Sequence, residues 1–167
     1  MTTAPQELAG RACTALTSAG LIRLITEIDD NGPIPPRGLA RIFPDLTRHQ
    51  IRQTIEQAHT LGLARIRSGA GLGLTDAGLQ LADLYDSTAR WARTHNYPRP
   101  ACTFITRVRA TLQLLTPVQG PVAAPSAAPV EAVGDLAQLR EALDRWIDSH
   151  WSGGEPAGVL QSLPETA

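Results

Sequence analysis

The sequence contains no lysine, so all 15 of its basic side chains are arginines. Two interpretations of this absence remain open: a GC-rich coding bias that exchanges lysine for arginine without selection, or a use for the planar guanidinium group, which suits phosphate and guanine. Cysteine is scarce as well, and Cys13 and Cys102 have no CxxC partner and no histidine at metal-ligand spacing. We therefore expect no disulfide framework, no metal site and no cofactor, but two small apolar core residues, with a redox-sensing thiol as the alternative.

Long apolar runs are also missing. No uninterrupted apolar segment approaches the roughly 20 residues that span a bilayer, and "MTTAPQELAG" lacks the basic-then-apolar order of a secretion signal. We therefore expect a soluble, cytoplasmic protein with no membrane partner. The 167 residues, 43% of them hydrophobic, suffice for one domain with extensions but not for a second large domain.

Charge is distributed unevenly along the chain. The formal net charge of −1 argues against a protein that coats nucleic acid non-specifically, but it does not exclude a local basic face. Residues 37–67 hold six arginines against two acids, a net of +4, whereas residues 131–155 hold six acids against two arginines, a net of −4. The first segment could meet phosphate and the second could not.

Apolar periodicity and turn residues predict a mainly α domain with a small β-hairpin over residues 1–98. The expected elements are a helix over 8–28, a short helix over 36–42, a helix over 48–61 with Thr47 as its N-cap, a hairpin of strands 63–67 and 72–75 across the turn 68–71, and a long helix that Thr75 and Asp76 begin and "HNYPRP" ends.

Further segments follow this domain. Residues 99–116 carry one apolar stripe and predict an additional helix. Residues 117–133 are rich in proline and alanine and nearly uncharged, as is typical of a linker. Residues 134–152 predict an acidic amphipathic helix, and residues 153–167 a flexible tail.

Three helices, a two-stranded hairpin and a long helix follow one another in the order of a winged helix-turn-helix domain. In that fold the third helix enters the major groove of DNA and the hairpin touches the adjacent backbone. Five local sequence features match this arrangement: "GP" before the second helix, "LT" at the start of the third, "LGLA" at its end, "LTDAG" after the hairpin and a Trp near the end of the long helix. With them the chain resembles, over roughly residues 20–95, the winged-helix transcriptional regulators of the HxlR and MarR type. It departs from the HxlR type at "TSAGLIRLI", where those proteins carry Gly-Gly-Lys-Trp. The resemblance implies a bacterial, sequence-specific DNA-binding regulator that acts as a dimer on double-stranded DNA.

The exposed face of the third helix supplies the candidates for base contact. Arg48 and Arg52 are four residues apart and share a face, so either could place its guanidinium on guanine O6 and N7. Gln53 could pair with adenine, and Thr47 and His49 could reach a phosphate or a base edge. The expected backbone contacts are Arg65, Arg67 and Ser68 of the hairpin and Arg37 of the second helix. The alternative is a solvated helix face with scattered arginines.

A homodimer surface is expected on the helices after the hairpin, because they carry more apolar surface than a winged helix alone can cover. The residues concerned are Leu84, Tyr85, Trp91, Ile105, Val108, Leu112 and Leu115. The amphipathic helix over 135–151 has three possible destinations: its own dimer core, the other subunit or a separate protein. A fourth alternative is autoinhibition, in which the −4 segment covers the +4 face.

Two other classes of function are alternatives to DNA binding. The winged helix could instead be a protein–protein interaction module that docks a partner through the C-terminal helix, and only DNA binding would depend steeply on salt. We expect no enzyme and no catalytic residue, because neither cysteine and none of the four histidines lies in a recognisable catalytic signature.

Overall fold

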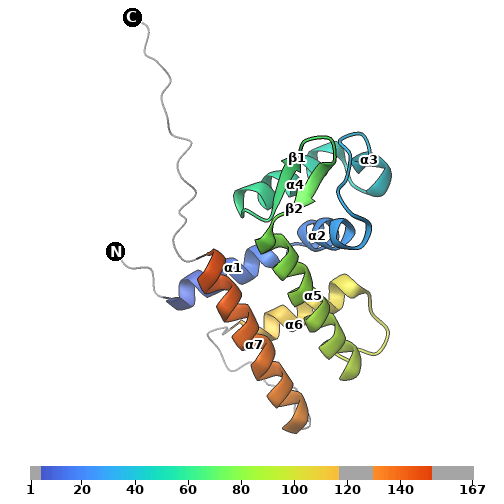
Figure 1. Cartoon of the computed structure of the whole chain (residues 1–167). Coiled ribbons are helices and arrows are strands. Elements are labelled where there is room, and N and C mark those ends of the chain that lie inside the picture. The colour runs from blue at the N-terminus through green and yellow to red at the C-terminus, as the bar shows by residue number, and fades with distance from the viewer. Residues whose placement is uncertain (1–4, 117–129, 152–167) are drawn as a thin grey trace, which may run out of the picture.

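The computed structural model describes residues 5–116 and 130–151, with side chains described for 10–116 and 132–151. These ranges form seven helices and a two-stranded antiparallel hairpin (Figure 1), which confirms the expectation of a mainly α fold with a small hairpin. The elements are α1 (Pro5–Leu16), α2 (Ala19–Asn31), α3 (Leu39–Ile42), α4 (Arg48–Thr60), β1 (Ala64–Arg67), β2 (Gly71–Leu74), α5 (Asp76–Thr94), α6 (Phe104–Leu115) and α7 (Val130–His150). None of the helices in the described ranges combines the length and the apolar character that crossing a bilayer requires.

The single helix predicted over 8–28 is wrong, because the chain breaks it into α1 and α2 at residues 17 and 18. Ser18 is extended, with φ −60° and ψ 124°. The break lets α2 cross α4 at close range: a Cβ on Gly20 would lie 2.6 Å from the Thr54 hydroxyl oxygen. The helix crossing therefore depends on a residue without a side chain.

The hairpin has a third, minimal strand beside it. In the β1–β2 register Ile66 is opposite Leu72, and Leu72 also exchanges backbone hydrogen bonds with Ile34, which lies between α2 and α3. Gly71, with φ +98°, is required at this contact because a Cβ there would overlap the backbone of Ile34. β2 is thus the central strand and β1 is its outer edge.

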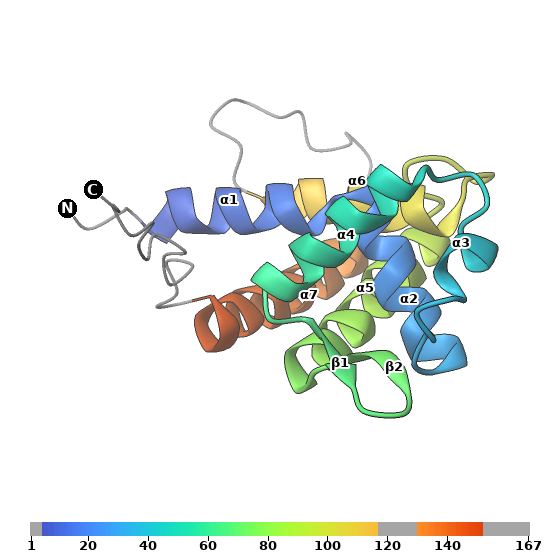
Figure 2. The same ribbon diagram turned by 90° about the horizontal axis from the view of Figure 1, so that it is seen from above.

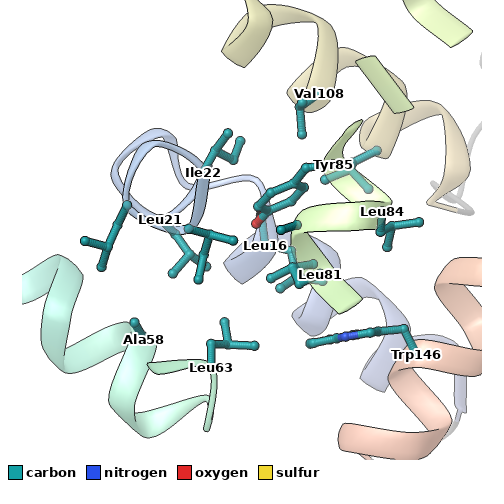
Figure 3. Packing of buried hydrophobic residues seen from close by; sticks show 14 of the residues in the cluster. Leu16, Leu21, Ile22, Ala58, Leu63, Leu81, Leu84, Tyr85, Val108 and Trp146 are labelled. Carbon is teal, nitrogen blue, oxygen red and sulfur yellow. Dashed lines mark hydrogen bonds between the residues drawn. The ribbon is translucent and has the colours of Figure 1, made fainter. Parts of the chain in front are cut away.

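α5 runs through the centre of the core. Its N-cap is Thr75, whose side-chain oxygen accepts a hydrogen bond from the Gly78 amide at 3.2 Å, as predicted. Tyr85 is fully buried and donates its hydroxyl hydrogen to the Leu16 carbonyl at 2.7 Å, which joins α5 to α1 (Figure 3). Figure 3 also shows Trp146 of α7 reaching the same cluster, so the core includes the C-terminal helix.

The dimer surface inferred from the sequence is not available on the outside of this chain. Leu84, Tyr85, Trp91, Val108, Leu112 and Leu115 are at most 8% exposed, and Ile105 is half-buried. The physical reason is that α6 and α7 of the same chain cover α5 (Figures 1 and 2). α7 buries apolar surface of α5 that would otherwise be free for a second subunit.

α7 packs against its own chain, which decides between the destinations considered for residues 135–151. Its main packing partners are α5, α1 and α6. The Trp146 indole donates to the Ala77 carbonyl at 3.1 Å, and the Trp91 indole of α5 donates to the Ala132 carbonyl at 3.2 Å. The apolar stripe of α7 is therefore used within the chain, and α7 is neither a free ligand for a partner protein nor a cover for α4.

The boundary of the predicted linker 117–133 also moves. α7 begins at Val130, so the last four of those residues are helical. Residues 117–129 of the linker, and the tail predicted over 153–167, lie outside the described residues.

Candidate nucleic-acid interface

The start of α4 is fixed by a reciprocal cap. The Thr47 side-chain oxygen accepts the Gln50 amide at 3.2 Å, and the Gln50 side-chain oxygen accepts the Thr47 amide at 2.8 Å. This capping box confirms Thr47 as the N-cap and defines where the helix begins. The Thr47 hydroxyl is engaged in the cap, so its first role is structural, and contact with phosphate stays a prediction.

The two faces of α4 separate cleanly by chemistry. Ile51 and Ala58 are buried against the core. On the same side, the Gln57 side-chain amide donates to the Ala15 carbonyl at the end of α1 at 3.1 Å. The opposite face is exposed and carries the four residues expected to meet bases: Arg48, His49, Arg52 and Gln53. The structure thus places all four together on the first two turns of one helix.

An ion pair that the sequence did not reveal holds the loop before α4. Arg23 of α2 makes two hydrogen bonds to the Asp45 carboxylate, at 2.6 and 3.0 Å, and its guanidinium lies over the Phe43 ring at 5.2 Å. This pairing lowers the pKa of Asp45 and raises that of Arg23, chiefly through the hydrogen bonds. Asp45 is one of the two acids in residues 37–67, and its charge is therefore neutralised by Arg23, which lies outside that segment.

Three arginines of residues 37–67 are exposed and form no ion pair within the described ranges. Within the described ranges the only salt bridge joins Arg23 and Asp45. Arg48, Arg52 and Arg65 therefore have no carboxylate partner in these ranges. All three are exposed. An exposed guanidinium without an ion pair can bind a phosphate or a base edge without first breaking an existing interaction.

The hairpin presents its basic residues unequally. Arg65 and Ser68 are exposed without a described partner, whereas Arg67 folds back and donates from its guanidinium to the Leu74 carbonyl at 2.7 Å. Arg67 therefore braces the hairpin and has other N–H groups left for a phosphate. Ile66 is 63% exposed on the outer strand, whereas Ala64 of the same strand is buried. Ile66 is therefore an edge residue that the core does not reach.

Arg37 lies in the exposed turn just before α3 rather than inside the predicted helix over 36–42. α4 packs against α3 and β1, and Figure 1 shows α3, α4 and the hairpin together at the upper right of the molecule. The predicted DNA-binding residues thus come from neighbouring elements rather than from scattered ones.

The remaining reactive side chains form no comparable site. No group of three or more His, Cys, Asp or Glu residues in the described ranges could hold a metal ion. Cys13 is buried, and that burial is the main reason that its thiol pKa is raised, which disfavours the reactive thiolate. The His95 ring packs against Trp91 in a tilted arrangement, with ring centroids 4.9 Å apart, and the Cys102 thiol donates to the Arg99 carbonyl at 3.3 Å.

Comparisons with known proteins add no further assignment, because the chain matches no protein-family model, no curated protein and no solved structure. The case for the candidate interface therefore depends on its own geometry and charge.

Proposed function

We propose that the chain is a winged helix DNA-binding protein that regulates transcription, with α4 in the major groove and the β1–β2 hairpin on the adjacent backbone. The order of the elements supports this fold. The short bridge between Ile34, which lies between α2 and α3, and Leu72 of the hairpin supports it as well. The ranges α2, α3 and α4 would be the three helices of the motif.

One observation carries the proposal: the exposed face of α4 bears Arg48 and Arg52 without carboxylate partners in the described ranges, next to a hairpin that presents Arg65. α4 carries one exposed acid, Glu56, after these residues, so its positive charge is concentrated in the first two turns, whereas acids and arginines alternate along α7. Here the forked donors suit guanine and phosphate, and Gln53 suits adenine.

The proposal assigns two kinds of contact. Arg48, Arg52 and Gln53 read base edges, while Arg65, Arg67, Ser68 and Arg37 bind phosphate, which fixes the position on the duplex. The dimer expected for a two-fold operator would have to use surfaces other than the buried residues of α5 and α6. The interaction-module alternative loses its main support, because the apolar stripe of α7 is used inside the chain.

Fluorescence anisotropy with labelled duplexes tests the proposal directly. Binding of the intact chain to a random duplex should weaken with salt, with a log–log slope of about −0.9 for each phosphate neutralised. Arg65→Ala should reduce this slope by about one. Arg140→Ala, an exposed arginine of α7, is the matched control and should leave the slope unchanged.

Base reading needs a selected site. On the best duplex recovered from a randomised pool, Arg48→Ala or Arg52→Ala should cost about 1–3 kcal/mol and relax the preference at one position. A salt slope near zero would overturn DNA binding. Equal losses for Arg48→Ala on selected and random duplexes would overturn the reading role of α4.

A further inference from the structure

One side of α5 is left uncovered by its own chain. α2, α6 and α7 pack against the other sides of this helix, and Figure 1 shows α6 and α7 against it. The uncovered residues are spaced alternately by four and three positions, which keeps them on one side of a helix. All five are exposed: Leu79, Asp83, Asp86, Arg90 and Arg93. We call these five residues the α5 stripe.

The charges of the α5 stripe follow a fixed order, with two acids first and two arginines after them. Asp86 and Arg90 are four residues apart, a spacing that permits an ion pair within one helix. Neither residue forms an ion pair within the described ranges, and the same is true of Asp83 and Arg93. All four charges are therefore available to a second molecule.

Neighbouring elements do not compensate the acidic half of the stripe. Arg145 of α7 lines the same surface hollow as Asp83 but forms no ion pair with it. On α2, partial burial and then the charges of three nearby aspartates raise the pKa of Asp29; two of the three are Asp83 and Asp86. Arginines brought by another molecule would relieve this repulsion.

The order of charges is self-complementary about position 88. Asp86 and Arg90 each lie two residues from that position, and Asp83 and Arg93 each lie five residues from it. When two copies of α5 cross in antiparallel directions with position 88 on a two-fold axis, each aspartate lies opposite an arginine of the other copy. A stripe of a single sign would instead repel its own copy.

The two ends of this arrangement are apolar. Leu79, which begins the stripe, is 44% exposed. Tyr97 lies at the same distance in sequence on the other side of position 88, just beyond the end of α5, and is half-buried with its ring edge against Trp91. Across the two-fold axis Leu79 of one copy would therefore come toward the aromatic end of the other.

We propose that a second copy of this chain docks on the α5 stripe, in a two-fold dimer that pairs Asp86 with Arg90 and Asp83 with Arg93 across the axis. These residues are distinct from the buried side chains of α5. Such a dimer would supply the symmetry of a two-fold operator, but the proposal does not rest on DNA binding, because its test uses no DNA.

Sedimentation equilibrium of the intact chain measures the dimer. Because charge rather than apolar area dominates the stripe, we expect a dissociation constant of roughly 1–100 µM. Raising the salt from about 50 to about 500 mM should weaken the dimer at least about fivefold, since exposed ion pairs are screened.

Charge reversal tests the pairing itself. Asp83→Arg with Asp86→Arg makes the stripe wholly basic, and Arg90→Asp with Arg93→Asp makes it wholly acidic. Each double variant alone should dimerise at least about tenfold more weakly than the parent. An equimolar mixture of the two should form a heterodimer, and a chain with all four substitutions should regain the homodimer, because its order of charges is inverted but still self-complementary.

A matched control separates pairing from net charge. Glu141→Arg with Asp148→Arg changes the net charge as much as the basic variant does, but at exposed positions of α7. This variant should keep the dimer of the parent and should form no heterodimer beyond the parent's own level with the acidic variant. All the substituted side chains are exposed, so the helical circular dichroism should be retained.

Three outcomes would each overturn the proposal: a parent chain that stays monomeric throughout this concentration range, a dimer that both stripe variants retain, or a mixture of these variants that gains no heterodimer.

Discussion

Trp146 offers the sharpest test of whether α7 belongs to the folded core. The side chain is 5% exposed in the cluster formed with α5, and its indole nitrogen donates to the Ala77 carbonyl at 3.1 Å. Replacing a buried Trp with Ala removes the apolar contacts and leaves a cavity, for which about 3–5 kcal/mol of stability is the usual loss. Trp146→Ala should therefore lower the free energy of unfolding by this amount.

The contribution of the hydrogen bond can be separated from that of the ring. Trp146→Phe keeps an aromatic ring but removes the indole N–H. The Ala77 carbonyl lies inside α5, where the helix already uses that oxygen, so losing the second donor should cost only about 0.5–1.5 kcal/mol. Some loss of volume adds to this, and the total should stay well below that of Trp146→Ala.

Urea unfolding followed by circular dichroism at the helix band measures these differences without depending on Trp fluorescence. The slope with urea should remain that of the parent chain if the same surface is exposed on unfolding. Val133→Ala on the same helix, at a side chain that is 57% exposed, is the control and should change stability by less than about 0.5 kcal/mol. Equal, small effects of Trp146→Ala and Val133→Ala would refute the packing of α7 on α5.

Three further substitutions test other parts of the structure. Tyr85→Phe should lower the free energy of unfolding by about 1–3 kcal/mol in urea titrations, because it leaves the buried Leu16 carbonyl without its donor; a neutral result would contradict that bond. Gly71→Ala should lower the thermal midpoint sharply, because the new methyl group would overlap the backbone of Ile34 at a positive φ; an unchanged midpoint would show that the hairpin does not pair there. Asp45→Asn should destabilise the chain at neutral pH but not at low pH. The pKa of Asp45 is lowered in the folded state, so its contribution is complete above the ordinary value of about 3.9 and disappears as the pH falls through the folded value. A difference between parent and variant that persisted at pH 2 would oppose this assignment.

Local chemistry accounts for what the sequence predicted well. Thr47 and Thr75 were recognisable as caps because the preference of hydroxyl side chains for the first helix position depends only on nearby amides. The hairpin followed from alternation and glycines in the same way. The exposed face of α4 could also be predicted, since helical periodicity separates Ile51 and Ala58 from Arg48 and Arg52 without tertiary information.

What the sequence could not give depends on distant parts of the chain. The break at residues 17 and 18 was hidden because apolar residues continue at helical spacing across it, and its reason, the crossing at Gly20 and Thr54, joins residues far apart in sequence. Arg23 and Asp45 are 22 residues apart, with no periodicity to pair them. The destination of α7 had the same difficulty: amphipathicity predicts that one face is buried but not which surface buries it.

The packing of α7 on its own chain explains how a protein of near-zero net charge could still have a basic DNA-binding face. A chain with a net charge of −1 has no general attraction for DNA, so binding must come from a local field. α7 packs on α5, α1 and α6 and exposes Asp135, Glu141, Asp144 and Asp148. The arginines without a carboxylate partner in the described ranges project from α4 and the hairpin. At physiological salt, charges are screened beyond about 8 Å, so two faces on different elements can act on their surroundings almost independently. Overall acidity is therefore compatible with a DNA-binding face, and it would suppress non-specific adhesion elsewhere on the surface.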